Sequence, residues 1–163
     1  MRSEFDPIGN FVRESNMIEG IRREPTEAEC AVMEAFMELE RLTVEDVVAF
    51  VKAVQPNAIL RDDPKVSGVR VGNHVAPKSG IHIRERLEKL LIRAADPDGS
   101  SPYDVHQHYE HLHPFTDGNG RSGRAIWAWS MNKLVGADSM DVIWARGFLH
   151  SWYYQSLSEW RRT

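Results

Sequence analysis

The chain has 163 residues with 42% hydrophobic and 27% charged side chains, a composition typical of one globular domain with a single core. Its formal net charge of −4 gives no electrostatic support for binding to nucleic acid or to an anionic membrane. One cysteine excludes an internal disulfide and no apolar run is long enough to span a bilayer, so we expect a cytoplasmic protein.

The first predicted helix is short and polar on one side. Residues 1–10 contain a proline and a glycine and are expected to form an irregular lead-in, with helix from Phe11 onward. Within this helix Ser15 and Glu19 are four residues apart, so their side chains project from one face. On these grounds alone, Glu19 is a solvated carboxylate of an amphipathic surface helix.

Two further helices have strong start signals. Thr26 is followed three residues later by Glu29, and Thr43 by Asp46, and both pairs match a capping box. Apolar residues recur at helical spacing behind each pair. Both segments are therefore predicted to be helical, the second ending near Pro56.

The pattern changes over residues 57–80, where prolines and glycines break any helix. Two β-like pieces remain, at 66–71 and 73–76, and Gly72-Asn73 between them is a hairpin turn signal. We therefore predict a β-hairpin here. A hairpin with a purely structural role is the alternative to a functional one.

Helical periodicity returns after the hairpin. Residues 81–95 form one predicted helix, and Ser101-Pro102 begin another, with proline at its favoured first position. A largely buried helix is predicted to end near Gly136, and an aromatic-rich segment covers residues 142–160.

Four histidines lie along or just after the helix that begins at Ser101. They are His106, His108, His111 and His113. A zinc site would need ligands that converge from one side, whereas these side chains lie on different faces. The favoured interpretation is that His113 alone takes part in chemistry and the others are packed or solvated.

Residues 113–124 read HPFTDGNGRSGR and carry the strongest functional signal. Pro114 is expected to end the preceding helix near His113. In the loop Gly118-Asn119-Gly120, residues that tolerate positive φ let backbone N–H groups converge on an anion. A helix start directly afterwards adds further N–H donors at the same place.

The side chains of this stretch suit phosphate chemistry. Arg121 and Arg124 are three residues apart on neighbouring positions of one helical face, and arginine matches phosphate oxygens. Asp117 is a hard oxygen ligand suited to Mg²⁺, and His113 has the pKa range of a general base. The sequence DGNG alone would be an ordinary turn, but these neighbours favour a phosphate site.

This stretch resembles the signature of the Fic family, H-P-F-x-D/E-G-N-G/K-R-x-x-R, and matches every fixed position. Gly120 stands where the related Doc kinases carry lysine. The resemblance implies an all-α domain with a short β-hairpin, the flap, at about residues 66–80. It divides the chain into a lead-in with an inhibitory helix at 1–24 and a core domain at 25–163.

The resemblance implies transfer of AMP from ATP, with Mg²⁺, to a hydroxyl side chain of a target protein. By position in the motif, His113 would be the base and Asp117 the metal ligand. Gly118, Asn119, Gly120, Arg121 and Arg124 would bind the phosphates.

Two weaker resemblances concern the target and the adenine. The predicted hairpin stands where the family places its flap, so Val71, His74 and Val75 would hold an extended target segment by β-strand addition. The sequence YYQSL, which includes Tyr154, resembles the family pattern Y-Y-x-x-L, so Tyr154 would pack against adenine. Ordinary core packing of these aromatic residues is an equal alternative.

The stretch from Ser15 to Gly20 resembles the family's inhibitory motif, S/T-x-x-x-E-G/N. Glu19 held against Arg124 would occupy the place and the charge partner that the γ-phosphate of ATP needs. The resemblance therefore implies a self-inhibited enzyme in which Ser15 and Glu19 form the brake.

Three alternatives stay open. The enzyme could use another donor, such as one that supplies UMP or phosphocholine, although Gly120 speaks against phosphorylation. It could be a nucleotide-binding regulatory module without transfer, or it could remove AMP from modified proteins. The expected partners are ATP and a hydroxyl-bearing protein segment, with homodimerisation left open and neither membrane nor nucleic acid expected.

Overall fold

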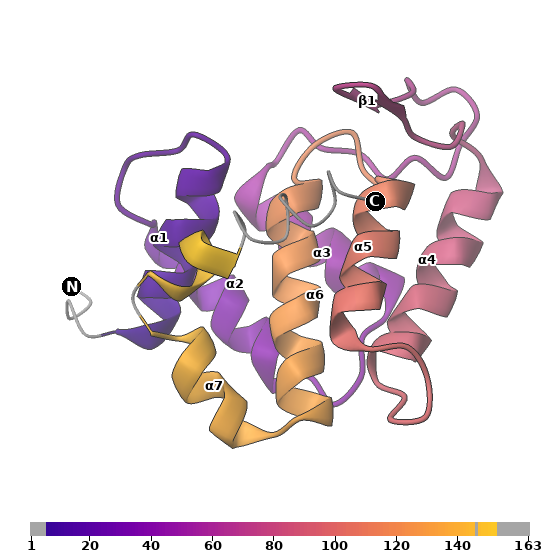
Figure 1. Ribbon diagram of the computed structural model, residues 1–163. Coiled ribbons are helices and arrows are strands. Elements are labelled where there is room, and N and C mark those ends of the chain that lie inside the picture. Colours follow the sequence, from indigo (N-terminus) through magenta and orange to yellow (C-terminus); the bar gives the residue numbers. More distant parts are fainter. Residues whose placement is uncertain (1–5, 146, 153–163) are drawn as a thin grey trace.

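The computed structural model describes residues 6–145 and 147–152, which form helices around one core and a small antiparallel hairpin (Figure 1). The elements in chain order are α1 (Pro7–Ile18), α2 (Glu27–Glu38), α3 (Val44–Val54), β1 (Arg70–Val71), β2 (His74–Val75), α4 (Ile81–Ala94), α5 (Pro102–Leu112), α6 (Asn119–Leu134) and α7 (Ala137–Ile143). The predicted fold class, an all-α domain with a short hairpin, is confirmed. Within the described ranges, no helix combines the length and apolar character that a membrane span requires.

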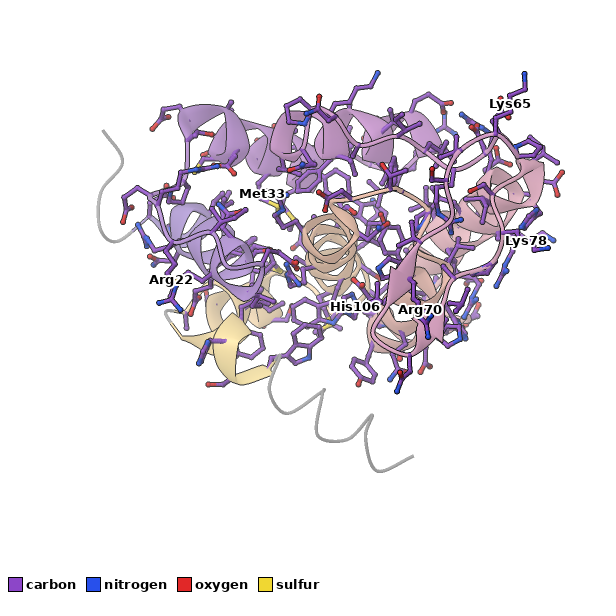
Figure 2. The ribbon with its side chains drawn as sticks, turned by 90° about the horizontal axis from the view of Figure 1, so that it is seen from above. Arg22, Met33, Lys65, Arg70, Lys78 and His106 are labelled. Carbon is purple, nitrogen blue, oxygen red and sulfur yellow. The ribbon has the colours of Figure 1, made fainter. Side chains whose placement is uncertain are left out.

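Helix α6 lies at the centre of the molecule. Every residue from Arg121 to Ser130 is buried, and α6 packs against α1, α2, α3, α4, α5 and α7. Figure 2 shows α6 nearly end-on, with the other helices around it. A helix buried on all sides is expected only inside a domain, so the N-terminus of α6 is held by the whole core.

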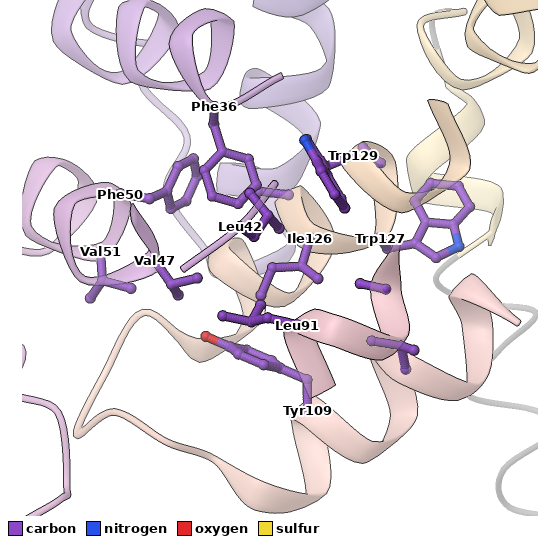
Figure 3. Close-up of a cluster of buried hydrophobic side chains, with 14 of the residues drawn as sticks. Phe36, Leu42, Val47, Phe50, Val51, Leu91, Tyr109, Ile126, Trp127 and Trp129 are labelled. Carbon is purple, nitrogen blue, oxygen red and sulfur yellow. The ribbon is translucent and has the colours of Figure 1, made fainter. Parts of the chain in front are cut away.

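Large side chains on α6 and its neighbours form the core shown in Figure 3. Trp129 of α6 is 1% exposed and donates its indole N–H to the Leu39 carbonyl at 2.8 Å. Phe36 of α2 and Phe50 of α3 pack with ring centroids 5.2 Å apart. Burying each such side chain contributes about 1.5–3 kcal/mol, which fixes α6 relative to its neighbours.

The predicted helix starts are confirmed at three places. Thr26 and Glu29 form a reciprocal capping box at α2, and Thr43 and Asp46 form one at α3. Ser101 accepts from the Asp104 N–H and so caps α5. These starts were predictable because each signal, a capping box or the Ser101-Pro102 pair, involves residues at most three positions apart.

The N-terminal prediction was wrong at one point. Residues 7–10 were expected to be irregular, but α1 begins at Pro7, with Asp6 as its N-cap. Proline is favoured in the first turn of a helix because the N–H that it lacks would have no intrahelical partner there. Pro7 therefore marks the start of α1 and does not delay it.

The hairpin is present but shorter than predicted. Its strands pair Arg70 with Val75 and Val71 with His74 around a turn at Gly72, which has a φ of 58°. The predicted first strand began at Val66, but the Val66 N–H donates to the Asp63 carbonyl and lies in a turn. Local turn bonds compete with the strand there and shorten it.

A second pairing connects the segment before the hairpin to the loop between α5 and α6. Leu60 and Phe115 form an antiparallel bridge, and the Thr116 N–H donates to the Ile59 carbonyl at 2.9 Å. The Arg61 N–H donates to the Pro114 carbonyl at 2.8 Å. In Figure 1 the hairpin and this loop lie at the same end of the molecule.

Candidate functional site

The loop between α5 and α6 is held by its own side chains. Helix α5 ends at Leu112, and His113 has left-handed backbone angles of φ 47° and ψ 63°. The Asn119 side chain accepts from the Phe115 N–H at 2.9 Å and donates to the Phe115 carbonyl at 2.8 Å. Because its side chain is used in this way, a role for Asn119 in binding phosphate would fall to its backbone N–H.

His113 has the geometry of a general base. Its Nδ1–H donates to the Glu110 carbonyl, which leaves the Nε2 lone pair free, and the side chain lines the cavity described below. Burial lowers the pKa of His113 from its ordinary value, and the Glu110 carbonyl opposes this shift only in part. The imidazole is therefore neutral near pH 7 and able to accept a proton.

The start of α6 forms an anion-binding end. Gly118 is its N-cap, with a φ of 77°, and the first helical residues are Asn119 and Gly120. The first N–H groups of a helix lack intrahelical partners and carry the positive end of its dipole. The residues at this helix start, 118–120, line a cavity of about 590 Å³ together with His113, Asp117 and both arginines of the motif.

The two arginines have different surroundings. Arg121 donates to the Val54 carbonyl at 3.0 Å and to Gln55 Oε1 at 3.2 Å, so it caps the C-terminal end of α3. Its Nε–H is enclosed and donates to no acceptor among the described residues. Arg121 is thus fixed by the fold and keeps one buried donor to spare.

Arg124 is bonded to α1 and to the turn after it. Its Nε donates to Ser15 Oγ at 2.9 Å, and its Nη2 donates to the Ser15 carbonyl at 3.0 Å and to Glu19 Oε1 at 2.8 Å. Arg124 is 3% exposed, whereas Glu19 is 40% exposed. The structure therefore brings together the three residues that were predicted to form a brake.

Gly120 leaves the space that Glu19 fills. A Cβ atom at Gly120 would overlap the Glu19 carboxylate, and it would also lie 3.1 Å from an Arg124 nitrogen. Any larger residue at this position would displace the carboxylate or the guanidinium. The glycine thus serves both the loop and the contact with Glu19.

Asp117 is exposed at the mouth of the cavity. One of its carboxylate oxygens accepts from the Gly118 N–H at 2.7 Å, and the side chain as a whole is exposed to solvent. In the described part of the chain, no three His, Cys, Asp or Glu side chains are grouped as a metal cage. An exposed carboxylate at the cavity mouth fits Mg²⁺ held jointly with phosphates, which is how Mg²⁺ is commonly bound.

The predicted flap residues lie on or beside this cavity. Val71 and His74 line it, and Val71 and Val75 are 52% and 65% exposed. His74 Nε2 is 2.8 Å from the His111 carbonyl, and the two rings lie 4.2 Å apart. These contacts hold the hairpin against the C-terminal end of α5.

The cavity residue Glu110 was missed by sequence reasoning. Glu110 has one enclosed oxygen, Oε1, which has no hydrogen-bond partner among the described residues and lies 3.9 Å from His106 Nε2. Burial raises the pKa of Glu110 to about 8, against the lowering effect of Arg124. A Cβ atom at Gly123 would overlap this carboxyl. The sequence signal for a side chain packed closely against α6 was therefore the glycine at position 123.

The other histidines of α5 do not converge with His113. His106 Nδ1–H donates to the Gly123 carbonyl at 3.1 Å, and burial lowers the pKa of His106 to about 4. His108 Nδ1 accepts from Arg93 at 2.9 Å. Each ring therefore has a separate structural partner.

The predicted adenine contact Tyr154 lies outside the described residues. Next to the cavity, Trp152 packs edge-on against Tyr103 and His106, with centroid distances of 6.3 and 5.2 Å. Trp152 also stacks on Trp127 at 4.6 Å. Tyr103 and His106 line the cavity, so one of its walls is aromatic.

Comparison with known proteins gives one finding that agrees with this geometry. No curated protein and no solved structure matches the chain. The family model described as Fic/DOC family matches residues 33–131, which include the loop and most of α6. Because the match covers more than half of the 163 residues, the chain belongs to the Fic/DOC family.

Proposed function

We propose that this chain transfers AMP from ATP to a hydroxyl side chain of a target protein, and that Glu19 holds it inactive. Membership of the Fic/DOC family implies nucleotide-type transfer in general. The observation that carries the finer proposal is the free Nε2 of His113 beside the anion-binding end of α6 in one cavity. A base and a phosphate site next to each other are what phosphoryl-centred transfer to a hydroxyl requires.

In the proposed reaction, the target hydroxyl oxygen attacks the α-phosphorus of ATP. The bond from that phosphorus to the bridging oxygen breaks, and pyrophosphate leaves. His113 Nε2 takes the hydroxyl proton, which is possible because its neutral form prevails near pH 7. Backbone N–H groups of Asn119 and Gly120 and the Arg124 guanidinium stabilise the negative charge on the phosphates.

Mg²⁺ bound to Asp117 would supply charge neutralisation at the phosphate oxygens. The exposed carboxylate of Asp117 leaves room for such an ion to carry water and phosphate ligands as well. The backbone bond from Gly118 to Asp117 keeps the carboxylate oriented toward the cavity mouth. The tripeptide at 117–119 thus links metal binding to phosphate binding.

The brake follows from competition for one guanidinium. Glu19 Oε1 and both acceptors on Ser15 take up Arg124, which the terminal phosphate of ATP would otherwise use. A carboxylate there also repels phosphate directly. Removal of the Glu19 side chain removes one acceptor from the Arg124 guanidinium, while Ser15 still holds the arginine in position.

The decisive experiment is mass spectrometry of the Glu19→Gly variant after incubation with ATP and Mg²⁺, alone and with a cell lysate. We expect AMP on the variant itself or on lysate proteins, and much less with the wild-type chain. Parallel incubations with UTP and CDP-choline identify any other donor. Glu40→Gly serves as a matched control, because Glu40 is also exposed and lies outside a helix.

A second variant separates the base from the brake. Glu19→Gly combined with His113→Ala should bind ATP but add no AMP, since the base contributes roughly 10²–10⁴-fold to such transfers. Equal modification by wild type and Glu19→Gly would remove the brake. Normal modification by the double variant would remove the role of His113.

A further inference from the structure

Arg61 is a fully buried cation whose function the motif does not explain. It is 0% exposed, and in the described part of the chain no carboxylate receives a hydrogen bond from its guanidinium. Burial lowers the pKa of this guanidinium, and no acid among the described residues offsets the effect. A buried charge without an ion partner is costly, so its four hydrogen bonds need a reason.

Two of these bonds clamp the backbone of the base. Arg61 Nε donates to the His113 carbonyl at 2.7 Å, and Nη2 donates to the Leu112 carbonyl at 2.8 Å. These carbonyls stand on either side of the His113 Cα, whose left-handed φ of 47° is uncommon for a residue other than glycine. One rigid guanidinium therefore fixes the backbone angles that aim the imidazole.

The same carbonyls belong to the end of α5, where helix carbonyls lack partners and the dipole favours a positive charge. Arg61, which lies outside the helix, supplies both the hydrogen-bond donors for these carbonyls and the positive charge. Its backbone adds to the clamp, because the Arg61 N–H donates to the Pro114 carbonyl at 2.8 Å.

The other side of the guanidinium holds the chain that returns from the hairpin. Nη1 donates to the Pro77 carbonyl at 2.7 Å and to Ser79 Oγ at 3.2 Å. The Arg61 carbonyl accepts from the Gly80 N–H at 2.9 Å. Pro77 follows β2 by two residues, so Arg61 holds the base of the hairpin directly.

We propose that Arg61 is a positioning residue that sets the hairpin and His113 in one fixed frame, so that a target segment held on the hairpin presents its hydroxyl to Nε2. This inference rests on the proposed transfer to a hydroxyl. Arginine is required because its planar fork spans acceptors on both sides, whereas the compact ammonium of lysine cannot. Misplacement by about 1 Å of groups that react together costs roughly 10²-fold in rate.

The first test uses Arg61→Lys in the Glu19→Gly chain. We expect kcat for AMP addition to a protein target to fall roughly 10²-fold, with the Kd for ATP unchanged, because no ATP contact is assigned to Arg61. Arg61→Ala should regain activity on addition of millimolar guanidinium, which can occupy the vacated site. Arg84→Lys is the matched control, because Arg84 binds the carboxylates of Asp62 and Glu45 outside the cavity and should leave kcat unchanged.

The second test does not depend on transfer activity. In Arg61→Lys, hydrogen exchange of the Ala76 N–H, which bonds to Val69 at the hairpin base, should accelerate, and the imidazole NMR signals of His113 should shift. Ser79→Ala removes the longest of the four guanidinium bonds, together with the 3.5 Å bond from Ser79 Oγ to the Ser67 carbonyl, and should accelerate hairpin exchange alone. If Glu19→Gly adds no AMP, the proposed function fails, but these signals still decide whether Arg61 couples the two elements.

Two outcomes would overturn the inference. The first is a folded Arg61→Lys variant with unchanged hairpin exchange and unchanged His113 signals. The second is a uniform loss of thermal stability in which kcat per folded molecule stays at the value of Glu19→Gly. If Arg61→Ala does not fold, Arg61→Lys and Ser79→Ala carry the same comparison.

Discussion

The ionisation of His113 is the first property of a single residue that the site makes testable. Burial disfavours the imidazolium, so the pKa of the free protein lies below the ordinary value of 6.5. In the proposed transfer the active base is the neutral form, so activity should be lost as pH falls through that lowered pKa. We expect the acid limb of kcat/KM for the Glu19→Gly variant to lie below pH 6.5.

The control for this pH profile is His108→Gln, because His108 bonds to Arg93 and does not line the cavity. Its acid limb should coincide with that of its parent. An acid limb above pH 6.5, or an acid limb that shifts in His108→Gln, would show that another group controls the rate.

Glu110 provides a second prediction at this scale, on stability. The pKa of this carboxyl is raised from 4.5 to about 8, chiefly by burial. The folded state therefore holds a proton that the unfolded state has released, so the contribution of Glu110 to stability is lost as pH rises from about 4.5 to about 8. The upper limit of the slope is about 1.4 kcal/mol per pH unit.

The carboxyl is 31% exposed, so solvent reduces this slope. Relative to wild type, the free energy of unfolding of Glu110→Gln should rise by on the order of 1–2 kcal/mol when the pH is raised from about 6 to about 8. Urea titrations at both pH values measure the difference. Glu88→Gln, an exposed substitution on α4, should give parallel curves, and the same result for Glu110→Gln would contradict a protonated carboxyl.

At the scale of elements, the docking of α1 depends on one buried acid of α2. Glu29 is 3% exposed, caps α2, bonds to Arg23 and accepts from Asn16 Nδ2 of α1 at 3.3 Å. Burial would raise the pKa of Glu29, but the hydrogen bonds from Arg23 and Thr26 lower it to about 2. The stability that this carboxylate supplies is thus present above about pH 4.5 and is lost as the pH falls toward 2.

We expect Glu29→Gln to lower the free energy of unfolding by about 1–3 kcal/mol and to raise AMP transfer by a chain that retains Glu19. The second effect follows because Asn16 lies next to Ser15, which holds Arg124. Asp46→Asn is the matched control, since it weakens the other capping box without touching α1. Equal transfer by the two variants would show that the α1–α2 contact does not support the brake.

Elements were predictable where their signals are local. Both capping boxes and the motif loop join residues a few positions apart, and their chemistry could be read directly from spacing. Pro7 misled because a proline both breaks helices and begins them. The partners of Arg61 lie 52 residues away at His113 and 51 away at Leu112, and no local pattern records such contacts.

The same limit applied to Glu110. Its environment comes from the approach of α6 at Gly123, and a lone Glu in a helix carries no mark of burial. The pairing of Glu19 with Arg124, 105 residues apart, was expected only because two motifs resembled those of one family. Family resemblance thus supplied the long-range contact that periodicity could not.

At the scale of the whole molecule, the proposed brake makes α1 and the nucleotide competitors for one end of α6. The central position of α6 makes Arg124 a shared contact between the N-terminal helix and the cavity. If Glu19 takes the place of the terminal phosphate, its removal should favour ATP over ADP, because only ATP carries that phosphate. Coupling free energies of this kind typically change affinity by about 5- to 150-fold.

We therefore expect the ratio of ATP to ADP affinity to rise within that range from wild type to Glu19→Gly, with ADP affinity itself nearly constant. Calorimetric titration of both nucleotides with Mg²⁺ measures the ratio, and Glu40→Gly again gives the baseline. An equal gain for ATP and ADP would mean that Glu19 repels phosphate in general. If neither affinity changes, the Glu19–Arg124 ion pair is not coupled to nucleotide binding. A ligand can shift a contact only if its affinity differs between the states with and without that contact.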